Sequence, residues 1–333
     1  MKLIVPSYFN LFRCIASECR DSCCVGWDIA LDKRTEEKYK ALNGALGRRV
    51  QKSIYHSDGG AYIEMKDGRC PFLSECGLCD LICEYGEEIL SDICREHPRF
   101  YTVLGDVAYG GVGLSCEAAA RLILTEESHT YSEREIGREY EECDEELHAL
   151  VMSRRSGLIG AILGASDLRS GIRALMGQLL ALQSEIDGGL TNDFCIQGAT
   201  YELFEAYSEL EYMGDKLLAD IGRALPMIDK MKLGADGEAY LSRIGVYLID
   251  RYLPYAVEDG NAIGVGVLIL CSLAALALLF AECDELTLDR AIDISILYSK
   301  EIEYCEENVA AIREWDLSLA QSALGIIDAL TCG

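Results

Sequence analysis

The stretch CIASECRDSCCVGW, residues 14–27, decides how the front of this chain folds. Its four cysteines include an adjacent pair, Cys23 and Cys24, and the gaps are short enough for one loop to turn several thiols inward. Thiolates are soft ligands that suit zinc and iron–sulfur clusters. Because adjacent side chains point in different directions, the pair is expected to serve two different sites or layers, or to supply only one ligand. The stretch therefore predicts a thiolate-held metal centre.

A second group of cysteines extends this prediction. It lies in CPFLSECGLCDLICEYGEEILSDIC, residues 70–94, and is followed by Cys116. Ten of the sixteen cysteines lie at or before Cys116, whereas one zinc or iron–sulfur centre takes about four protein ligands. The sequence thus predicts two sites, or one site with spare thiols. The spacing matches neither the bacterial ferredoxin run nor a paired C-x2-C zinc ribbon, so the identity of the metal stays open. His97 could complete a mixed site or be an exposed turn residue.

Composition narrows the range of partners and compartments. The chain has 333 residues, half of them hydrophobic, and a formal charge of −26 at pH 7. Such acidity repels phosphate backbones, so no nucleic acid partner is expected, and it attracts a basic, lysine-bearing protein or simply keeps the molecule soluble. Residues 1–12 show no export signal. Thiols in this number are typical of a reducing cytosol, where they bind metal more often than they form disulfides. We expect a cytoplasmic protein.

The predicted fold is mainly α, with a cysteine-rich metal-binding region over residues 1–125 and a helical domain over residues 126–333. In the second region apolar residues recur at three- and four-residue steps, which is the helical period. Strand signals are confined to residues 61–65 and 101–114, which predict one or two short hairpins. The charged stretch 126–146 indicates a solvated linker or an exposed helix. The helical spacing is clearest at Leu158, Ile159, Ile162, Leu168, Ile172, Leu175 and Leu179, and at Tyr240, Ile244, Tyr247, Leu248 and Tyr252.

One apolar segment is long enough to cross a bilayer. Residues 262–281 carry no charged side chain, over about the length that a membrane-spanning helix needs. The flanks are acidic on both sides, with Glu258 and Asp259 before and Glu282 after, so neither end has the Lys/Arg excess of a cytoplasmic boundary. We therefore expect a buried core helix rather than a membrane span.

Four blocks in the front region resemble those of a known family, the flagellin lysine N-methylases. The blocks are FRCIASECRDSCCVGW, RCPFLSECGLC, LSDICREHPR and LSCEAAARLIL, in the same order. Weaker similarity continues through YLIDRYLPYA at 247–256 and SKEIEYCEENVAAI at 299–312, so the resemblance covers nearly the whole chain. It implies an enzyme that transfers methyl groups from S-adenosylmethionine to lysine ε-amines of flagellin, or of another lysine-bearing protein, and that holds an iron–sulfur cluster.

The resemblance also implies which cysteines bind the metal. The expected cofactor is a 4Fe–4S cluster, with zinc as the alternative at a second site. Cys76 and Cys83 are additional to the family pattern. His97 stands where the family more often has tyrosine, and Tyr304 stands where it tends to have histidine. Matching block by block gives the ligand set Cys14, Cys19, Cys23, Cys24, Cys70, Cys79, Cys94 and Cys116.

Candidates for methyl transfer can be named but not ranked. The reacting ε-amine must be neutral and in line with the methyl donor, which carboxylates or tyrosines along a channel can achieve. The Gly-rich stretch GDVAYGGVG, residues 105–113, predicts a hairpin turn because no βαβ unit surrounds it, so no doubly wound methylase fold is expected. Arg99 and Arg121 are candidates to bind the carboxylate of the cofactor, with structural salt bridges as the alternative. The catalytic candidates are Glu117, Glu301, Glu303, Tyr252, Tyr255 and Tyr304.

Two other functions compete with the enzyme. The cysteine layout would also suit a metal-binding or electron-transfer module with no methylase activity, or a structural adaptor that holds zinc. The long helical half favours the enzyme, because a metal carrier needs little of it. Visible absorption from thiolate-to-iron bands would exclude the zinc adaptor.

Overall fold

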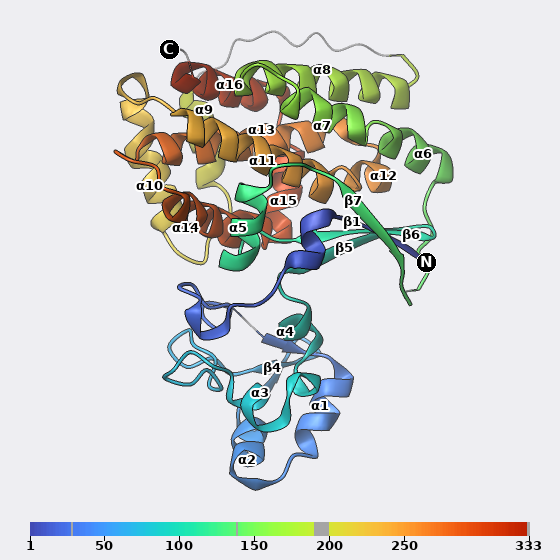
Figure 1. Cartoon of the computed structure of the whole chain (residues 1–333), viewed down its shortest axis with the longest axis vertical. Helices are drawn as coiled ribbons and strands as arrows, with labels where there is room; N and C mark the ends of the chain where they lie inside the picture. The colour runs from blue at the N-terminus through green and yellow to red at the C-terminus, as the bar shows by residue number, and fades with distance from the viewer. Residues whose placement is uncertain (28, 138, 190–199, 332–333) are drawn as a thin grey trace.

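The structure is a computed structural model that describes residues 1–27, 29–137, 139–189 and 200–331. Two parts of the chain stand apart in the ribbon (Figure 1). We call residues 13–98 the cysteine lobe and the remainder the helical body. Helices outnumber strands throughout the described residues, which confirms the predicted mainly α fold.

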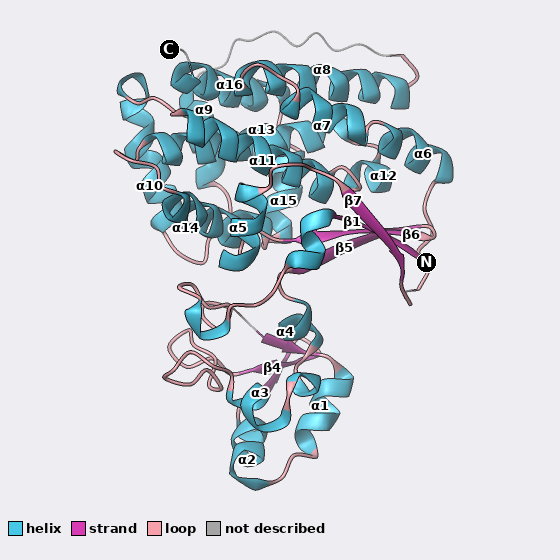
Figure 2. Ribbon diagram, viewed as in Figure 1, coloured by secondary structure: helices cyan, strands magenta, loops and turns pink. Residues whose placement is uncertain are grey.

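Figure 2 shows the helical body as a stack of helices, whose buried apolar residues form one core. Helix α8 begins where the Asp167 carboxylate accepts a hydrogen bond from the Ser170 N–H, an N-cap that satisfies one of the free donors of the first turn. Its buried side chains follow the spacing seen in the sequence and form one face. The helices of the body are α5 (Glu117–Thr125), α6 (Glu145–Ser153), α7 (Arg155–Leu163), α8 (Leu168–Ile186), α9 (Thr200–Ser208), α10 (Lys216–Ala224), α11 (Ala235–Tyr252), α12 (Tyr255–Asp259), α13 (Ala262–Ala281), α14 (Leu288–Tyr298), the π-helix η5 (Ser299–Glu303), α15 (Glu306–Arg313) and α16 (Leu317–Thr331).

Helix α13 forms the centre of the body. Its most apolar window is 94% buried inside the fold, and it packs against α8, α11, α15 and α16. It begins after Asn261, whose side chain accepts a hydrogen bond from the Gly264 N–H at 2.7 Å. The segment with the length and composition of a membrane span is thus a core helix, as its acidic flanks predicted, and no second helix of that kind occurs in the part of the chain that the structure covers.

A four-stranded sheet lies on the side of the body that faces the cysteine lobe (Figure 1). In the strand order β5-β6-β1-β7, β1 (Lys2–Pro6) pairs in parallel with β6 (Val107–Val112) and antiparallel with β7 (Tyr131–Glu135). Strands β5 (Arg99–Leu104) and β6 form a hairpin. Its turn holds Gly105 at φ 62°, a left-handed conformation that glycine adopts without strain. The hairpin predicted at the Gly-rich stretch is confirmed.

The sheet shows that the cysteine lobe is an insertion into the body. Strand β1 precedes the lobe in the sequence, and β5, β6 and α5 follow it, yet residues of all four belong to the core of the body. Residues 1–12 and 99–125 therefore pack with the helices of the body. The cause is a long-range pairing, in which Lys2 lies opposite Val107, and cysteine density carries no sign of it.

Strand β7 is a second difference from expectation. It lies within the charged stretch 126–146, for which a linker or an exposed helix was predicted. The strand is at the edge of the sheet, so its backbone pairs with β1 while its charged side chains remain in solvent. Charge on an edge strand is common because it prevents pairing with other molecules. The prediction that strands are confined to the front was wrong for this reason.

The cysteine lobe has a small sheet and core of its own. Strand β4 (Gly60–Ile63) lies between β2 (Ile29–Leu31) and β3 (Ile54–Ser57), antiparallel to both, which confirms the hairpin expected at residues 61–65. Eleven buried residues form the core, and Cys70 is one of them. The helices of the lobe are α1 (Lys33–Lys40), α2 (Gly44–Lys52), α3 (Asp80–Tyr85) and α4 (Asp92–Glu96).

Candidate metal centre and the adjoining cavity

The eight cysteines predicted to bind metal separate into two groups of four. The first cysteine set lies in the loop after β1 and at the start of α5. The pKa of the Cys116 thiol is raised to about 11, chiefly by burial and further by the neighbouring thiols of Cys19 and Cys14. The pKa of Cys23 is also raised, by a hydrogen bond with Cys24, by burial and by other thiols of the set. These thiols therefore lie close enough to influence one another electrostatically. The first cysteine set consists of Cys14, Cys19, Cys23 and Cys116.

The second cysteine set belongs to the core of the lobe and consists of Cys24, Cys70, Cys79 and Cys94. Cys70 is buried in the core, and the other three pack against the same apolar cluster. The Cys70 backbone N–H donates to the carbonyl oxygen of Cys24 at 2.8 Å, which holds the first loop against the second cysteine block. Burial raises the pKa of the Cys94 thiol to about 11, with smaller contributions from Cys24 and Cys79. The four thiols therefore form a second electrostatic group.

The two sets meet at the adjacent pair. The Cys23 thiol is hydrogen-bonded to Cys24, and this bond is the main reason why the pKa of Cys24 is lowered. Burial opposes the shift, while Ser22 and the positive charge of Arg69 add to it. Cys23 and Cys24, which are adjacent in the sequence, belong to different sets and are hydrogen-bonded to each other.

The donor atoms fit a thiolate-held group. Four thiols per set is the number that a zinc ion or an iron–sulfur cluster binds. Across the described ranges, no three His, Cys, Asp or Glu side chains converge tightly enough to hold one metal ion. A zinc ion needs its sulfurs about 2.3 Å from a single point, whereas in a cluster each cysteine binds a different iron and the sulfurs stand further apart. Which group the thiols hold stays a prediction.

The other cysteines lie outside the two sets. Cys76 and Cys83 are exposed on the surface of the lobe. Cys271 is buried in α13, far along the chain from the lobe. Cys195 and Cys332 fall outside the residues that the structure describes.

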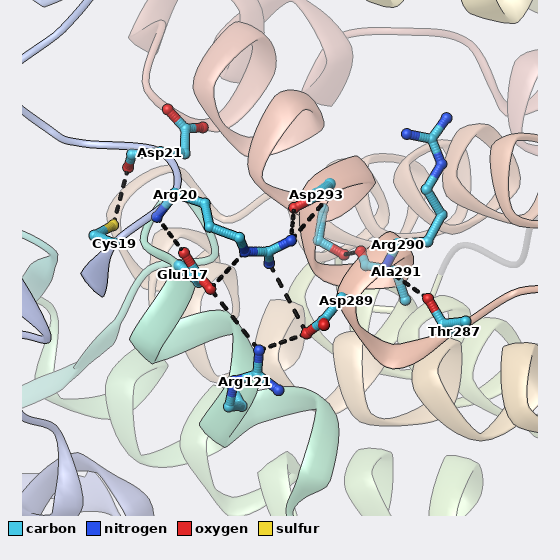
Figure 3. A network of polar contacts seen from close by, with 11 residues as sticks. Cys19, Arg20, Asp21, Glu117, Arg121, Thr287, Asp289, Arg290, Ala291 and Asp293 are labelled. Atoms are coloured by element: carbon cyan, nitrogen blue, oxygen red, sulfur yellow. Dashed lines mark hydrogen bonds and ion pairs between the residues drawn. The ribbon is translucent and has the colours of Figure 1, made fainter. Parts of the chain in front are cut away.

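A charged network ties the first cysteine set to the helical body (Figure 3). Arg20 donates from its backbone N–H (2.7 Å) and from Nε (2.8 Å) to the Glu117 carboxylate. These two residues directly follow Cys19 and Cys116, so the contact joins the two ends of the set. The Arg20 guanidinium also lies 3.1 Å from Asp293 on α14. Burial alone would raise the pKa of Glu117, but the hydrogen bonds from Arg20 hold it below its usual value. Glu117 is therefore a bound anion at this junction.

The two arginines predicted to bind the cofactor both have protein partners. Arg121 Nη2 lies 2.6 Å from Asp289 and 3.8 Å from Glu117. The Arg99 guanidinium lies 4.9 Å from the centre of the Phe12 ring. Neither arginine lines the cavity described below, and their role toward a cofactor stays a prediction.

Arg251 and Glu303 form a buried ion pair. Several of the catalytic candidates belong to it or contact it. The Glu303 carboxylate accepts hydrogen bonds from Tyr247 (2.7 Å) and Tyr252 (3.1 Å). Arg251 Nη1 lies 3.4 Å from the same carboxylate and donates to the Tyr247 hydroxyl at 2.7 Å. Tyr255 packs edge-on against Tyr252, with ring centroids 5.6 Å apart. Glu303 and Tyr252 are thus internal, and the Glu303 carboxylate balances the charge of Arg251.

A cavity of about 410 Å³ lies between the cysteine lobe and the helical body, and we call it the junction cavity. The lobe contributes Gly26 and Trp27, directly after the adjacent cysteines. The body contributes the loop 211–213, the π-helix η5 and Tyr304. Short π-helical segments occur frequently at functional sites. The cavity therefore places a body surface against the segment that follows Cys24 in the sequence.

Two of the catalytic candidates, Glu301 and Tyr304, line the junction cavity. Glu301 is buried, and its Oε2 accepts a hydrogen bond from the Met213 N–H at 2.7 Å. The Tyr304 ring meets the Trp27 ring edge to face, with centroids 5.0 Å apart. Sequence reasoning missed Trp27 and Lys300 as site residues, although both lie in the blocks that carry the family resemblance. Only the folded chain brings these two blocks together, so no local pattern could have paired them.

A second polar centre lies away from the cysteines. His129 Nδ1 lies 2.8 Å from Glu126, and its Nε2 lies 3.0 Å from Asp250. Burial would lower the pKa of His129, but hydrogen bonds with Asp250 and Glu126 raise it to about 9. Tyr131 on β7 donates to the other Asp250 oxygen at 2.6 Å. The charged imidazole thus helps to fix the edge strand to α11, beside a cavity of about 550 Å³.

Together, fold and site define a mainly α protein in which a cysteine-rich lobe is inserted into a helical body, with seven of the eight cysteines of the two sets in the lobe and Cys116 in the body. Over 139 residues the chain is 30% identical to the lysine-N-methylase of Salmonella typhimurium strain LT2 and to that of Salmonella choleraesuis. The matched stretch covers 39% of this chain and 35% of each relative. Over 149 residues it is 30% identical to the flagellar biosynthetic protein FliU of Salmonella muenchen, which is 40% of this chain and 88% of that protein.

The chain belongs to the family of these proteins, the FliB-like lysine-N-methylases. The resemblance drawn from the cysteine blocks is thereby confirmed. The chain spans about a third of the length of the lysine-N-methylases that it matches. No family model and no solved structure matches it.

Proposed function

We propose that this protein transfers methyl groups from S-adenosylmethionine to lysine side chains of flagellin, and that its cysteine lobe holds an iron–sulfur cluster. The observation that carries the proposal is membership of a family that includes proteins named lysine-N-methylase. The flagellar name of a third relative supports flagellin, or another lysine-bearing flagellar protein, as the substrate. The reaction takes place in the cytoplasm, where the thiols stay reduced.

The two cysteine sets support the metal-dependent form of this function. In the proposal one set holds a 4Fe–4S cluster and the other holds a second cluster or zinc. When bound, such a cluster would supply redox-active or Lewis-acidic iron. The chain itself holds the thiols ready: the Cys70–Cys24 backbone hydrogen bond orders the second set, and the Arg20–Glu117 contact orders the first.

The junction cavity offers groups that can prepare a lysine amine. The amine attacks the methyl group with its lone pair, so the ammonium form must first lose a proton. Glu211 lines the cavity and has a carboxylate that can accept that proton. The new N–C bond then forms while the C–S bond breaks, and the electron pair of the broken bond stays on the sulfur. Tyr304 provides a second polar group at the same wall.

The surface charge favours a basic partner. The chain carries a net −26 at pH 7, and opposite charge speeds the encounter of two proteins. Because this attraction acts between exposed groups, raised salt should slow capture of the substrate more than the chemical step.

The proposal is tested with protein purified without oxygen and analysed for iron, sulfide and zinc. After incubation with flagellin and S-adenosylmethionine, mass spectrometry of the flagellin should show lysines heavier in steps of one methyl group. Omission of S-adenosylmethionine should abolish the gain. No gain from the metal-replete protein, together with no binding of S-adenosylmethionine in calorimetry, would favour a metal-binding module without methylase activity.

A further inference from the structure

The junction cavity is large enough to hold a small molecule. Its volume of about 410 Å³ is within the range of small-molecule sites. Trp27 on its lobe side comes three residues after Cys24. A ligand in the cavity would therefore contact the segment that follows the adjacent cysteines in the sequence.

One wall of the cavity is aromatic. The Trp27 and Tyr304 rings are joined by His97, whose ring centroid lies 6.1 Å from Trp27 and 6.0 Å from Tyr304. Burial lowers the pKa of His97 to about 4, helped by the charge of Lys300, so the imidazole is neutral at pH 7. Trp27 Nε1 and His97 Nε2 are buried, and neither has a hydrogen-bond partner within the described part of the chain. Buried polar atoms normally have partners, and of these two residues Trp27 lines the cavity, so its indole N–H can serve a ligand there.

The lining of the cavity also carries charges of both signs. Glu301 presents a buried carboxylate with one oxygen fixed by Met213. Lys300 Nζ lies 2.7 Å from Asp21 and 5.7 Å from the centre of the Trp27 ring. An ammonium group therefore already lies over the indole face, which shows that this face accepts a positive charge. Pairing with Asp21 uses one of the three N–H donors of Lys300 and leaves two for a ligand.

The charged wall is held in place before any ligand arrives. The Asn308 side chain accepts from the Glu211 N–H at 2.8 Å. It donates to the Glu211 carbonyl at 2.6 Å and to the Glu301 carbonyl at 2.9 Å. One buried amide thus fixes the loop 211–213 to the π-helix. Preorganised sites of this kind lose little conformational entropy on binding.

We propose that the junction cavity is the binding site for S-adenosylmethionine, a small zwitterion with a sulfonium, an ammonium, a carboxylate and an aromatic base. The inference rests on the proposed methylase function. Lys300 can pair with the carboxylate of S-adenosylmethionine, and Glu301 can pair with its ammonium. The Trp27 indole can contact its sulfonium or its aromatic base. A lysine side chain brings one positive charge only and would leave Lys300 and the aromatic wall without a role.

Calorimetry on the full, metal-replete chain tests this assignment. S-adenosylmethionine, S-adenosylhomocysteine and Nα-acetyl-lysine amide are titrated separately. S-adenosylmethionine should bind more tightly than S-adenosylhomocysteine, because only the former carries the sulfonium. Trp27→Leu, Lys300→Met and Glu301→Gln should each weaken its binding by about tenfold or more, the size expected for one lost charge or cation–π contact.

Matched controls use charged residues of the body outside the cavity. Lys216→Met and Glu282→Gln remove groups that pair with Asp220 and Arg223, and both variants should bind S-adenosylmethionine as the wild type does. Circular dichroism and iron content establish that each variant is folded and loaded.

The outcomes separate the site from the function. If the wild type binds S-adenosylmethionine and all three cavity variants bind it equally well, the site is wrong and the methylase proposal stands. If the variants weaken only the binding of the lysine amide, the cavity belongs to the substrate side chain, and the inference is overturned. If the loaded wild type does not bind S-adenosylmethionine, both proposals fail.

Discussion

The cysteine lobe and the helical body are stabilised by very different amounts of buried apolar surface. The core of the lobe has eleven buried residues, one of them a cysteine, and its strands are three or four residues long. The body surrounds α13, whose apolar window is 94% buried, and its core extends from β1 to α16. Hydrophobic burial can stabilise the body without assistance. In the proposal, the lobe is stabilised in addition by the metal that its cysteines hold.

Small folding units commonly need such assistance. A core of this size offsets little more than the conformational entropy of its own loops, so disulfides or metals usually supply the rest. Every cysteine that the structure describes is a free thiol. Metal binding is therefore the cross-link that the proposal assigns to the lobe, and its binding energy would be folding energy.

Loss of one ligand from the second cysteine set should produce the largest effect. Cys79→Ala is expected to empty that set and abolish the cooperative unfolding of the lobe, because the loops without metal have little core. The helices of the body should remain. Metal analysis and hydrogen exchange of lobe peptides measure both effects. Cys83→Ala, an exposed cysteine on α3, is the matched control and should change neither.

The same measurement shows whether the two sets are independent. Cys116→Ala should release a different part of the metal from that released by Cys79→Ala, and the double variant should release all of it. Complete loss from either single variant would mean that the cysteines form one site. Full metal occupancy in both would contradict the assignment of ligands.

Local features of both parts could be predicted from the sequence, whereas their assembly could not. The hairpin at Gly105, the helical spacing through Leu175 and the buried role of α13 each depend on neighbours in the chain. The pairing of Lys2 with Val107 and the meeting of Trp27 with Lys300 depend on contacts across the fold. Short-range periodicity contains no record of such contacts, so the insertion of the lobe and the junction cavity were missed.

A core substitution in α13 tests the other side of the comparison. Leu270 is fully buried, and Leu270→Ala should cost the body about 2–5 kcal/mol of unfolding free energy through lost burial and a cavity. The metal content of the lobe should stay unchanged. Urea unfolding followed by circular dichroism measures the cost. Leu163→Ala, at a side chain that is 48% exposed, should cost much less, and an equal cost would show that burial does not dominate the stability of the body.

The pH dependence of the body should reveal the buried His129. Its pKa is about 9 in the fold and 6.5 in the reference state, so the stabilisation is complete below about pH 6.5 and is lost as the pH rises through about 9. The loss is expected to be at most about 3 kcal/mol. Urea unfolding of the wild type between about pH 6 and about pH 10 should show this loss, and His129→Gln should remove it.

The control for this pH effect is an exposed histidine. His56→Gln replaces a side chain that is 62% exposed, and this variant should keep the pH dependence of the wild type. The same dependence in His129→Gln would mean that another group titrates.

The smallest effect concerns the Arg20–Glu117 contact that joins the two parts. Arg20 is 42% exposed, whereas Glu117 is 5% exposed, so solvent screens one partner and not the other. Arg20→Met leaves a buried carboxylate with fewer partners and should cost about 1–2 kcal/mol, while Glu117→Gln keeps the shape and should cost less. A double-mutant cycle, read by urea unfolding and by hydrogen exchange of residues 16–24, gives the coupling energy.

The exposed pair Arg223–Glu282 is the matched reference, with a coupling expected below about 1 kcal/mol. If the two couplings are equal, the ion pair adds nothing to the docking of the lobe, and the ends of the first cysteine set must be held together by the metal alone.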